Sequence, residues 1–439
     1  MKTHFSKLAL GLGAASMFLS ASAFAYRDLD DRLDTLEKEM QEISAHNPQG
    51  TYGAKFATAR PETEGTRWYV ALDVLYWHPK MGGTEFAIGY TPQGYISSES
   101  IPEVATQHYP RGKVKENDFS WDLGLKVGLG YKTPHDKWDV FARYTWFESH
   151  SSNSMHKDAP SAIIPLKINF DATINIFTTD LFKMKFFCNH AKSTVDIDYN
   201  NIDLELSRSY FTSKNWSVRP HLDIKATFLS IDQKVQYIQD VNQDISSLFY
   251  DLLSPEVKVD LKSKIKGLGP RLGLDTKLYL GNGFNIFADA SGSILYSSVK
   301  TSQKDVLPNF EFGGLFPERV IELFNEVFDI LFGGPSRDLK HKYHRFFPYA
   351  HAALGLEWNK YLNQKKQHLS LKMGYEVHYY WRVNQLENVS NVFSEPTITA
   401  VDLDNTIQVT VVPHGRHDNV HNSNDLMFYG ITGSARLDF

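Results

Sequence analysis

The sequence predicts an all-β transmembrane fold: a closed, antiparallel, up-and-down outer-membrane β-barrel with a short N-terminal heptad helix. Three observations support this prediction. The chain starts with an export signal, apolar and polar residues then alternate with a period of two, and the connections between alternating segments are short and long in turn. Short turns on one side and long loops on the other are typical of outer-membrane barrels.

Composition excludes several other classes of protein. The 439 residues are 42% hydrophobic and 22% charged, with a net charge of −5 and one cysteine. A helical membrane protein needs several apolar runs of about 20 residues, for which the chain is too polar. A single cysteine excludes a disulfide scaffold and a cysteine-based metal centre. The slightly acidic charge argues against a nucleic acid partner.

Residues 1–25 are predicted to be a secretory signal peptide. Lys2 and Lys7 form a basic region, residues 8–19 form a short apolar stretch, and small residues lead to an Ala-x-Ala end at Ala25. This order is typical of a cleaved signal rather than a membrane anchor. We therefore expect cleavage after Ala25 and export across an inner membrane.

Residues 26–45 are predicted to form a periplasmic heptad helix. Apolar residues recur there at spacings of four and three, as in a coiled-coil seam: Leu29, Leu33, Leu36, Met40 and Ile43. The seam is short for a free coiled coil. It could join copies of the chain into a homo-oligomer such as a trimer, or belong to an amphipathic helix docked on the barrel. Residues 46–66, with scattered proline and glycine, are predicted to be a linker.

From residue 67 onward the pattern changes to strict alternation, and residues 67–439 are predicted to form the barrel. The clearest segment is 119–131, where one face is wholly apolar and the other is polar or glycine. Its apolar face carries Phe119, Trp121, Leu123, Leu125, Val127, Leu129 and Tyr131. A sheet in lipid must close on itself because every backbone polar group needs a partner, so the apolar face is predicted to meet lipid.

Nine further segments alternate in the same way, which gives ten predicted strands. They are 67–78, 137–148, 193–209, 215–230, 266–280, 284–297, 345–358, 368–383 and about 426–439. The phase of the pattern slips at Asn200 and Asn201, which predicts a β-bulge. Residues 166–177 also alternate, so a further hairpin could raise the count to twelve or more.

The predicted connections alternate in length. Short turns are expected around 132–136, 211–214, 281–283 and 360–366, and Gly281-Asn282-Gly283 is a tight hairpin signal. Long connections are expected at about 79–118, 149–192, 231–265, 298–344 and 384–425.

The inward face of the predicted strands carries both signs of charge. The candidate lumen residues are Arg143, Arg219, His221, Asp223, Lys225, Arg271, Asp275, Lys277, Lys372, Glu376, His378 and Arg382. They could line an aqueous pore with a transverse field and weak net selectivity. The alternative is a packed, salt-bridged lumen, because ten strands enclose a narrow space.

The last strand carries a candidate assembly signal. Outward residues alternate up to the final aromatic residue, and this pattern resembles the signal that the outer-membrane barrel-assembly machinery reads. The residues that carry it are Tyr429, Ile431, Leu437 and Phe439.

The long connections hold two further features. Residues 316–332 are predicted to form a helix that either constricts the lumen or packs on neighbouring loops. Histidines gather in the last two long connections and could bind zinc, although loops tolerate such residues without a function: His341, His344, His414, His417 and His421. We expect no resident metal, no cofactor and no enzymatic activity, because no catalytic or nucleotide-binding motif stands out.

Several segments together resemble a known family. They include Leu-Lys-Val-Gly-Leu-Gly-Tyr at 125–131, Tyr-Thr-Trp-Phe at 144–147, Gly-Leu-Gly-Pro-Arg-Leu-Gly-Leu at 267–274 and Ala-Arg-Leu-Asp-Phe at 435–439. Over most of 67–439 the chain resembles the Legionella-type pore-forming outer membrane proteins and the major-outer-membrane-protein-like porins of chlamydiae. It departs from the cysteine-rich chlamydial proteins, because Cys188 is alone.

The resemblance implies a porin in a Gram-negative-type outer membrane that passes small hydrophilic solutes by passive diffusion. The implied partners are the lipid bilayer, lipopolysaccharide and the barrel-assembly machinery. The alternative is a non-conducting structural or adhesin barrel whose long outer loops contact host or envelope partners.

Overall fold

The fold is described from a computed structural model of the chain. It describes residues 68–90, 112–133, 138–158, 161–168, 171–176, 179–185, 188–213, 215–238, 256–306, 336–362, 367–393, 397–403, 406–412, 415–421 and 423–439. The chain divides into two units, Met1–Lys55 and Phe56–Phe439, and all of these residues belong to the second. The predicted signal peptide, heptad helix, linker and 316–332 helix lie outside the described residues.

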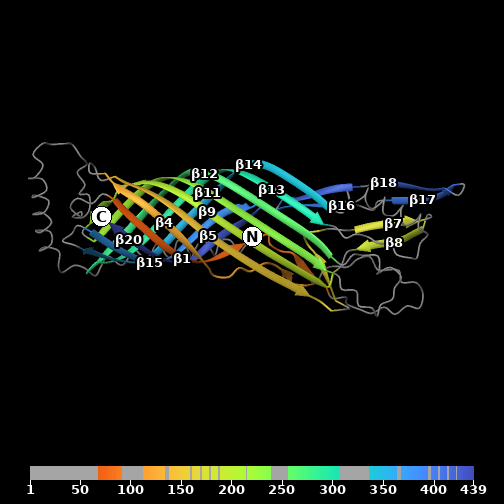
Figure 1. Cartoon of the computed structure of the whole chain (residues 1–439), viewed down its shortest axis with the longest axis horizontal. Helices are drawn as coiled ribbons and strands as arrows, with labels where there is room; N and C mark the ends of the chain where they lie inside the picture. The colour runs from red at the N-terminus through yellow and green to blue at the C-terminus, as the bar shows by residue number, and fades with distance from the viewer. Residues whose placement is uncertain are drawn as a thin grey trace, which may run out of the picture. The chain divides into compact units, whose positions relative to one another are not determined.

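Ten long strands form the barrel. They are β1 (Trp68–Met81), β4 (Asp122–Lys132), β5 (Asp139–His156), β9 (His190–Ser207), β11 (Trp216–Ile238), β12 (Glu256–Gly281), β13 (Phe284–Val306), β14 (Ser336–Leu362), β15 (Gln367–Asn384) and β20 (Asn424–Asp438). They run side by side and are inclined along the barrel (Figure 1).

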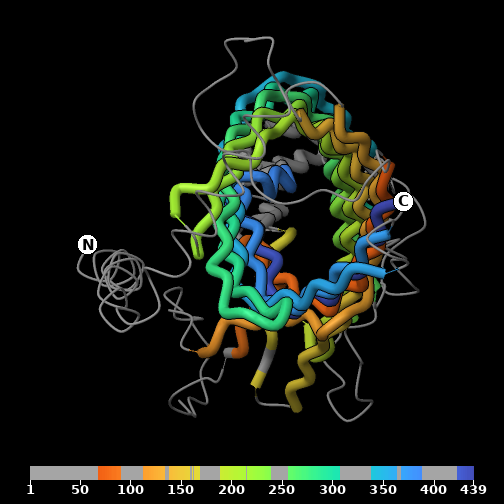
Figure 2. The backbone as a smooth tube through the Cα atoms, turned by 90° about the vertical axis from the view of Figure 1, so that its left-hand side faces the viewer, coloured from red at the N-terminus to blue at the C-terminus, as the bar shows by residue number. Residues whose placement is uncertain are grey.

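The ring of strands is closed and follows sequence order. Each strand pairs antiparallel with the next, β9 pairs with β11, and β1 pairs with both β4 and β20. Figure 2 shows this ring, with the red-orange start of the barrel next to its blue end. The predicted closed, up-and-down, ten-stranded barrel is therefore confirmed.

The remaining strands add nothing to the ring. β10 (Tyr210–Ser213) extends the edge of β11, while β7 (Asp171–Ile176) and β8 (Thr179–Lys185) pair only with each other. The alternating segment 166–177 therefore contributes to a separate hairpin, and the barrel does not reach twelve strands. Three more small sheets join β2 (Ala87–Tyr90) with β3 (Val114–Lys115) and β6 (Ala162–Pro165), β16 (Glu387–Phe393) with β19 (Gly415–His421), and β17 (Thr397–Leu403) with β18 (Thr406–Val412).

The outward face of the ring is apolar and has an aromatic residue at each edge. On β1 the exposed positions are every second residue from Trp68 to Tyr76. Trp68 packs on Tyr131 at one edge, and Tyr76 packs on Trp121 at the other. The nine residues from Trp68 to Tyr76 span eight steps, which is about 26 Å of strand or roughly 20 Å at a tilt near 40°. This height is slightly less than the apolar band of about 25 Å that outer-membrane barrels present to lipid.

Several strands continue beyond this apolar band, where the phase of the sequence pattern reverses. The predicted bulge at Asn200 and Asn201 is wrong, because β9 pairs without a register shift along its whole length. Val195, Ile197 and Tyr199 are buried inside the barrel, whereas Ile202 and its alternate neighbours face outward.

The same reversal explains why parts of the predicted long connections are strands. The segments 231–238, 256–265, 298–306 and 336–344 belong to β11, β12, β13 and β14. Their apolar residues point into the barrel mouth rather than toward lipid. We refer to the end of the barrel where these long connections leave as the mouth.

The Gly281-Asn282-Gly283 turn is formed as predicted. All three residues have positive φ angles, of 101°, 52° and 83°. Glycine reaches these angles without steric cost, which suits a tight hairpin turn between β12 and β13. Among the residues that the structure describes, no helix is long and apolar enough to span a membrane.

Candidate lumen site

Most of the predicted lumen residues lie on the inward face of the ring. This group is made up of Arg143, Arg219, His221, Asp223, Lys225, Arg271, Asp275, Lys277, Lys372, Glu376 and His378. Arg382 is a correction: its side chain is exposed and its φ is 54°. The pairing of β15 with β20 shifts register between Tyr380 and Asn384, so alternation does not place Arg382 inside.

One group of lumen charges surrounds Asp203 on β9. Its carboxylate lies 3.8 Å from Arg143, 3.4 Å from Lys225 and 3.6 Å from Arg271. A second buried carboxylate, Asp223, lies 3.2 Å from Arg271, so these three cations share two carboxylates. These residues belong to β5, β9, β11 and β12, so the group links one side of the ring.

A second group surrounds Arg219 on β11. The guanidinium donates to Asp275 at 2.6 Å, to Asp139 at 3.3 Å and to Glu205. Asp275 also lies 3.5 Å from His221. We call the Asp203 and Arg219 groups together the lumen charge network.

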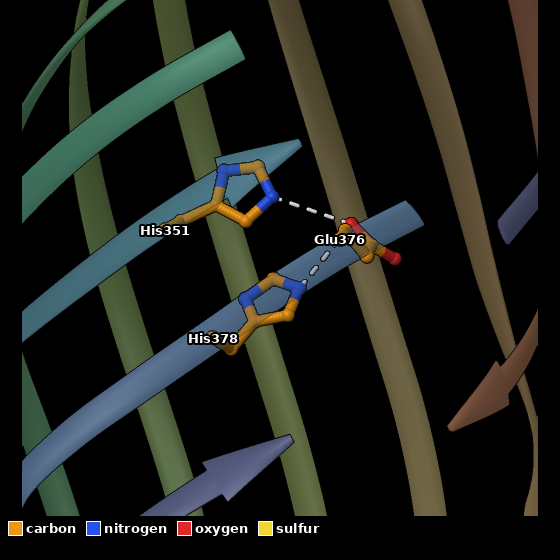
Figure 3. A group of neighbouring side chains, drawn as sticks. All are labelled: His351, Glu376 and His378. Atoms are coloured by element: carbon orange, nitrogen blue, oxygen red, sulfur yellow. Dashed lines mark hydrogen bonds and ion pairs between the residues drawn. The ribbon is translucent and has the colours of Figure 1, made fainter. Parts of the chain in front are cut away.

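A third group surrounds Glu376 on β15. Lys126 on β4 lies 2.7 Å from Oε1 and 2.8 Å from Oε2. Trp77 donates its indole N–H to Oε1 at 3.0 Å, and Thr432 donates to the same oxygen. His351 and His378 each place Nε2 at 3.3 Å from Oε2. Figure 3 shows both imidazoles directed at this carboxylate.

A fourth group lies nearer the short turns. Lys277 donates to Glu357 at 2.9 Å, and Ser370 donates to the same oxygen at 2.7 Å. Lys372 lies over the ring of Phe287, with 5.1 Å between its Nζ and the ring centroid. The described part of the lumen is thus crossed by paired charges at several levels.

The most buried of these lumen side chains are packed rather than solvated. Lys225 is 1% exposed and Asp223 is 1% exposed, and Glu376 and Arg271 are each 5% exposed. Taking such charges out of water is costly unless each is paired and hydrogen-bonded. The side chains therefore occupy the middle of the described lumen as an ion-paired layer.

Toward the mouth the interior becomes apolar. Side chains from most strands meet there, including Trp77, Phe147, Tyr199, Tyr349 and Phe428. This layer is a true hydrophobic core inside the barrel wall.

Three segments from the long connections enter this core. We call residues 82–90, 112–119 and 161–168 the mouth plug. Inward-facing wall residues hold its backbone: Tyr237 donates to the carbonyl of Phe86 at 2.6 Å and Gln233 donates to the carbonyl of Thr84 at 3.0 Å. Asn117 of the plug donates to the carbonyl of Ser193 at 3.0 Å. Bonds to β9 and β11 fix the plug inside the mouth.

Two buried groups at the plug have shifted pKa values. Burial lowers the pKa of Lys167 to about 8, and nearby Glu85 opposes this shift. The Lys167 ammonium donates to the carbonyl of Gly83 at 3.0 Å. Burial raises the pKa of the Cys188 thiol to about 12, and the thiol contacts the carbonyl of Ile163 at 3.7 Å.

Several residues of the lumen groups were not among the predicted lumen residues. They are Lys126, Asp139, Asp203, Glu205, His351 and Glu357. The period-two pattern contains the needed signal, because each lies between two outward apolar residues.

Other predicted site residues fall in different places. Tyr429, Ile431 and Leu437 lie on β20 and Phe439 follows it, all on the outward side. His341 lies 3.1 Å from Glu387, and His344 stacks on Tyr296. His414 lies outside the described residues, and the side chains of His417 and His421 are not described.

Comparison with known proteins places this barrel in a family. The sequence pattern of the family described as Legionella pneumophila major outer membrane protein precursor matches residues 60–439. The chain belongs to this family. The predicted family is confirmed, and this family member is located in the outer membrane, where its apolar band contacts the lipid bilayer. No curated protein is similar enough to be matched to it.

Solved barrels resemble this family member only distantly. The outer membrane protease OmpT of Escherichia coli is 9% identical, with a TM-score of 0.37, over 87% of this chain and 99% of that chain. A FadL homologue of Pseudomonas aeruginosa is 9% identical, with a TM-score of 0.23, over 85% of this chain and 91% of that chain. The toluene transporter TbuX of Ralstonia pickettii is 10% identical, with a TM-score of 0.24, over 87% of this chain and 90% of that chain. At these values none bears on what this chain binds or does.

Proposed function

We propose that this barrel passes small hydrophilic solutes and ions across the outer membrane by passive diffusion, in a non-catalytic role. The observation that carries the proposal is the polar cross-section of the lumen. Strands on every side of it direct charged side chains of both signs inward. Such a lining favours weak selectivity between anions and cations.

The ion pairs determine how wide the passage is. Because the lumen charges are buried and paired, an ion advances only when side chains exchange partners or move aside. We therefore expect small conductance steps and a weak ion preference rather than a wide, permanently open pore.

A non-conducting structural or adhesin barrel is the second candidate. It is favoured by the apolar core at the mouth and by the plug that is hydrogen-bonded into it. In this alternative the lumen groups serve stability, and the outer loops make the functional contacts.

Single-channel recording with a salt gradient separates the two candidates. The full chain in planar bilayers should give discrete steps, and a Lys277→Ala, Glu357→Ala double variant should give larger ones because both members of a lumen pair are shortened. Lys266→Met is the matched control, since this lysine is exposed on the outer side of β12. Absence of steps in all three proteins would leave the structural barrel as the function.

Partners beyond the lipid bilayer are part of the same proposal. The outward residues at the end of β20 are proposed as the signal for the barrel-assembly machinery, supported by their exposure beside the β1 seam. Lipopolysaccharide is proposed as the outer-leaflet neighbour of the apolar band. Trimer formation through the predicted heptad helix rests on the sequence pattern alone.

A further inference from the structure

His351, Glu376 and His378 converge on one point in the lumen. The two histidines lie on the neighbouring strands β14 and β15, and the glutamate lies two residues before His378 on β15. Because side chains two apart on a strand share a face, Glu376 and His378 both point inward. His351 is paired with His378 in the strand register, which brings the third side chain alongside.

The spacing of the three ligand atoms fits a tetrahedral metal ion. Each Nε2 is 3.3 Å from Glu376 Oε2, and all three atoms lie within 4.8 Å of one another. Zinc bonds of about 2.0–2.1 Å require ligand atoms roughly 3.4 Å apart in a tetrahedron. Two of the three edges already have this length (Figure 3).

The surroundings hold these ligands in place. Trp77 and Thr432 occupy Oε1 of Glu376, which directs Oε2 toward the histidines. Nδ1 of His378 is hydrogen-bonded to the hydroxyl of Tyr349 at 2.7 Å. Outer partners of this kind orient metal ligands and fix the ring nitrogen that faces the metal.

A second observation points to a missing cation. Nε2 of His378, one of the two ring nitrogens that face Glu376, has no hydrogen-bond partner of good geometry among the described residues. The His378 side chain is 8% exposed, so water does not readily satisfy it. When Nδ1–H donates to Tyr349, a lone pair on Nε2 faces the carboxylate, and a bound dication would remove this repulsion.

We infer that His351, Glu376 and His378 form a binding site for a transition-metal dication that prefers nitrogen and oxygen ligands, such as Zn²⁺. Lys126 is the resident competitor, because its ammonium lies 2.8 Å from the same Oε2. It also lies over the ring of Trp77, 4.8 Å from the centroid, toward which it can withdraw. Metal binding therefore exchanges one cation for another.

A second His-carboxylate group in the lumen serves as the internal control. Glu205, His221 and Asp223 also lie within metal-binding distance of one another. There, however, Arg219 bonds Glu205 and Arg271 bonds Asp223. Because arginine cannot lose its proton, this group is already neutralised and should not bind a metal.

The test is metal binding by the refolded full chain, with Co²⁺ and Zn²⁺ as probes. Co²⁺ should give the intense visible absorption of a tetrahedral site at one ion per chain, and Zn²⁺ should displace it. His351→Gln and His378→Gln should each weaken binding at least about tenfold. Lys126→Met should strengthen it, and His221→Gln should leave it unchanged.

Circular dichroism and heat-modifiable migration on gels identify variants that fail to fold. Where a glutamine variant does not fold, Glu376→Gln replaces it, since the amide keeps the shape of the side chain. The inference is overturned when the folded wild type gives no tetrahedral Co²⁺ spectrum. The inference is equally overturned when Co²⁺ binding is unchanged in His351→Gln and in His378→Gln. It is also overturned when His221→Gln abolishes Co²⁺ binding.

Discussion

Lys126 and Glu376 form a buried ion pair on the inner face of the barrel wall, with 2.7 Å between Nζ and Oε1. Their strands, β4 and β15, are separated in the ring by β1 and β20. The pair therefore bridges the seam where the ring closes, in addition to the backbone hydrogen bonds of that seam. Both side chains are less than a tenth exposed.

Removal of one partner of this pair should destabilise the barrel. Lys126→Met leaves the Glu376 carboxylate without its cation, and a buried pair broken on one side costs about 3–5 kcal/mol. The free energy of unfolding from urea titration in lipid vesicles, with a chelator present, measures the loss. The double variant Lys126→Met, Glu376→Gln should lose less free energy of unfolding than the two single variants lose together. Losses that simply add would contradict direct coupling between the two side chains.

Gly130 should not tolerate a side chain. A Cβ atom added there would lie 1.9 Å from the Tyr69 ring. Tyr69 is 1% exposed and donates its hydroxyl to Asp139 at 2.6 Å, so the ring cannot easily move away. Gly130→Ala should cost roughly 1–3 kcal/mol in the free energy of unfolding. Gly433→Ala, where nothing lies within 4 Å, is the matched control and should change it little.

Cys188 should report opening of the mouth plug. The thiol is 2% exposed and its raised pKa keeps it protonated, so a maleimide should label the folded barrel far more slowly than the urea-unfolded chain. Tyr237→Phe removes the bond to Phe86 and leaves the buried backbone N–H of Lys167, which donates to the Tyr237 hydroxyl at 3.1 Å, without its acceptor. An unpaired buried donor costs about 1–3 kcal/mol, so this variant should speed labelling about fivefold or more. Tyr296→Phe, on the lipid side, should have no effect. Equal labelling rates for the folded and unfolded chains would exclude a closed plug.

Lys167 should make the plug more stable at alkaline pH. Its pKa is about 10.5 in the unfolded chain and about 8 in the folded barrel. Between these values the unfolded chain binds more protons, so the stability increases as the pH rises from about 8 toward 10.5. The gain is up to about 3 kcal/mol. Lys167→Met should be more stable than wild type at pH 7 and lose this difference at pH 10, as measured by hydrogen exchange at the plug. A pH-independent difference would contradict this assignment.

Alternation was enough to predict the lipid-facing band and the closed ring. Within the band the outward positions must be apolar and the inward ones are free to be charged, as Leu125 and Lys126 illustrate. The alternation of apolar and polar residues therefore predicted both the positions of the strands and the inward direction of most of the charged side chains.

Beyond the lipid-facing band, the same rule gave a wrong prediction of which residues face outward. There the outer face of the wall meets water instead of lipid, and the inner face packs on an apolar core instead of charged side chains. Val195 and Ile202 are both apolar, yet one faces the core and the other faces lipid. A pattern of hydrophobicity does not distinguish these two apolar environments, which produced the false bulge.

The partners within the lumen could not be predicted from sequence spacing. Lys126 and Glu376 are brought together by the closure of the ring, and His351 meets Glu376 only through the register of β14 on β15. Arg382 was misplaced for a related reason, since the local shift in register at the end of β15 leaves no trace in the residue types.

The β1–β20 seam also determines the order of assembly. It pairs Tyr69 with Asp438 and continues to Met81 with Leu426, while the backbone N–H of Phe439 bonds the carbonyl of Trp68 at 2.9 Å. Every other neighbouring pair in the ring is consecutive among the ten barrel strands, whereas this one joins the first barrel strand to the last. Bringing such distant strands together carries the largest loop-closure entropy, so the seam should form last. Until then β1 and β20 both present unpaired edges, and an unfinished barrel is a sheet prone to pair with its neighbours.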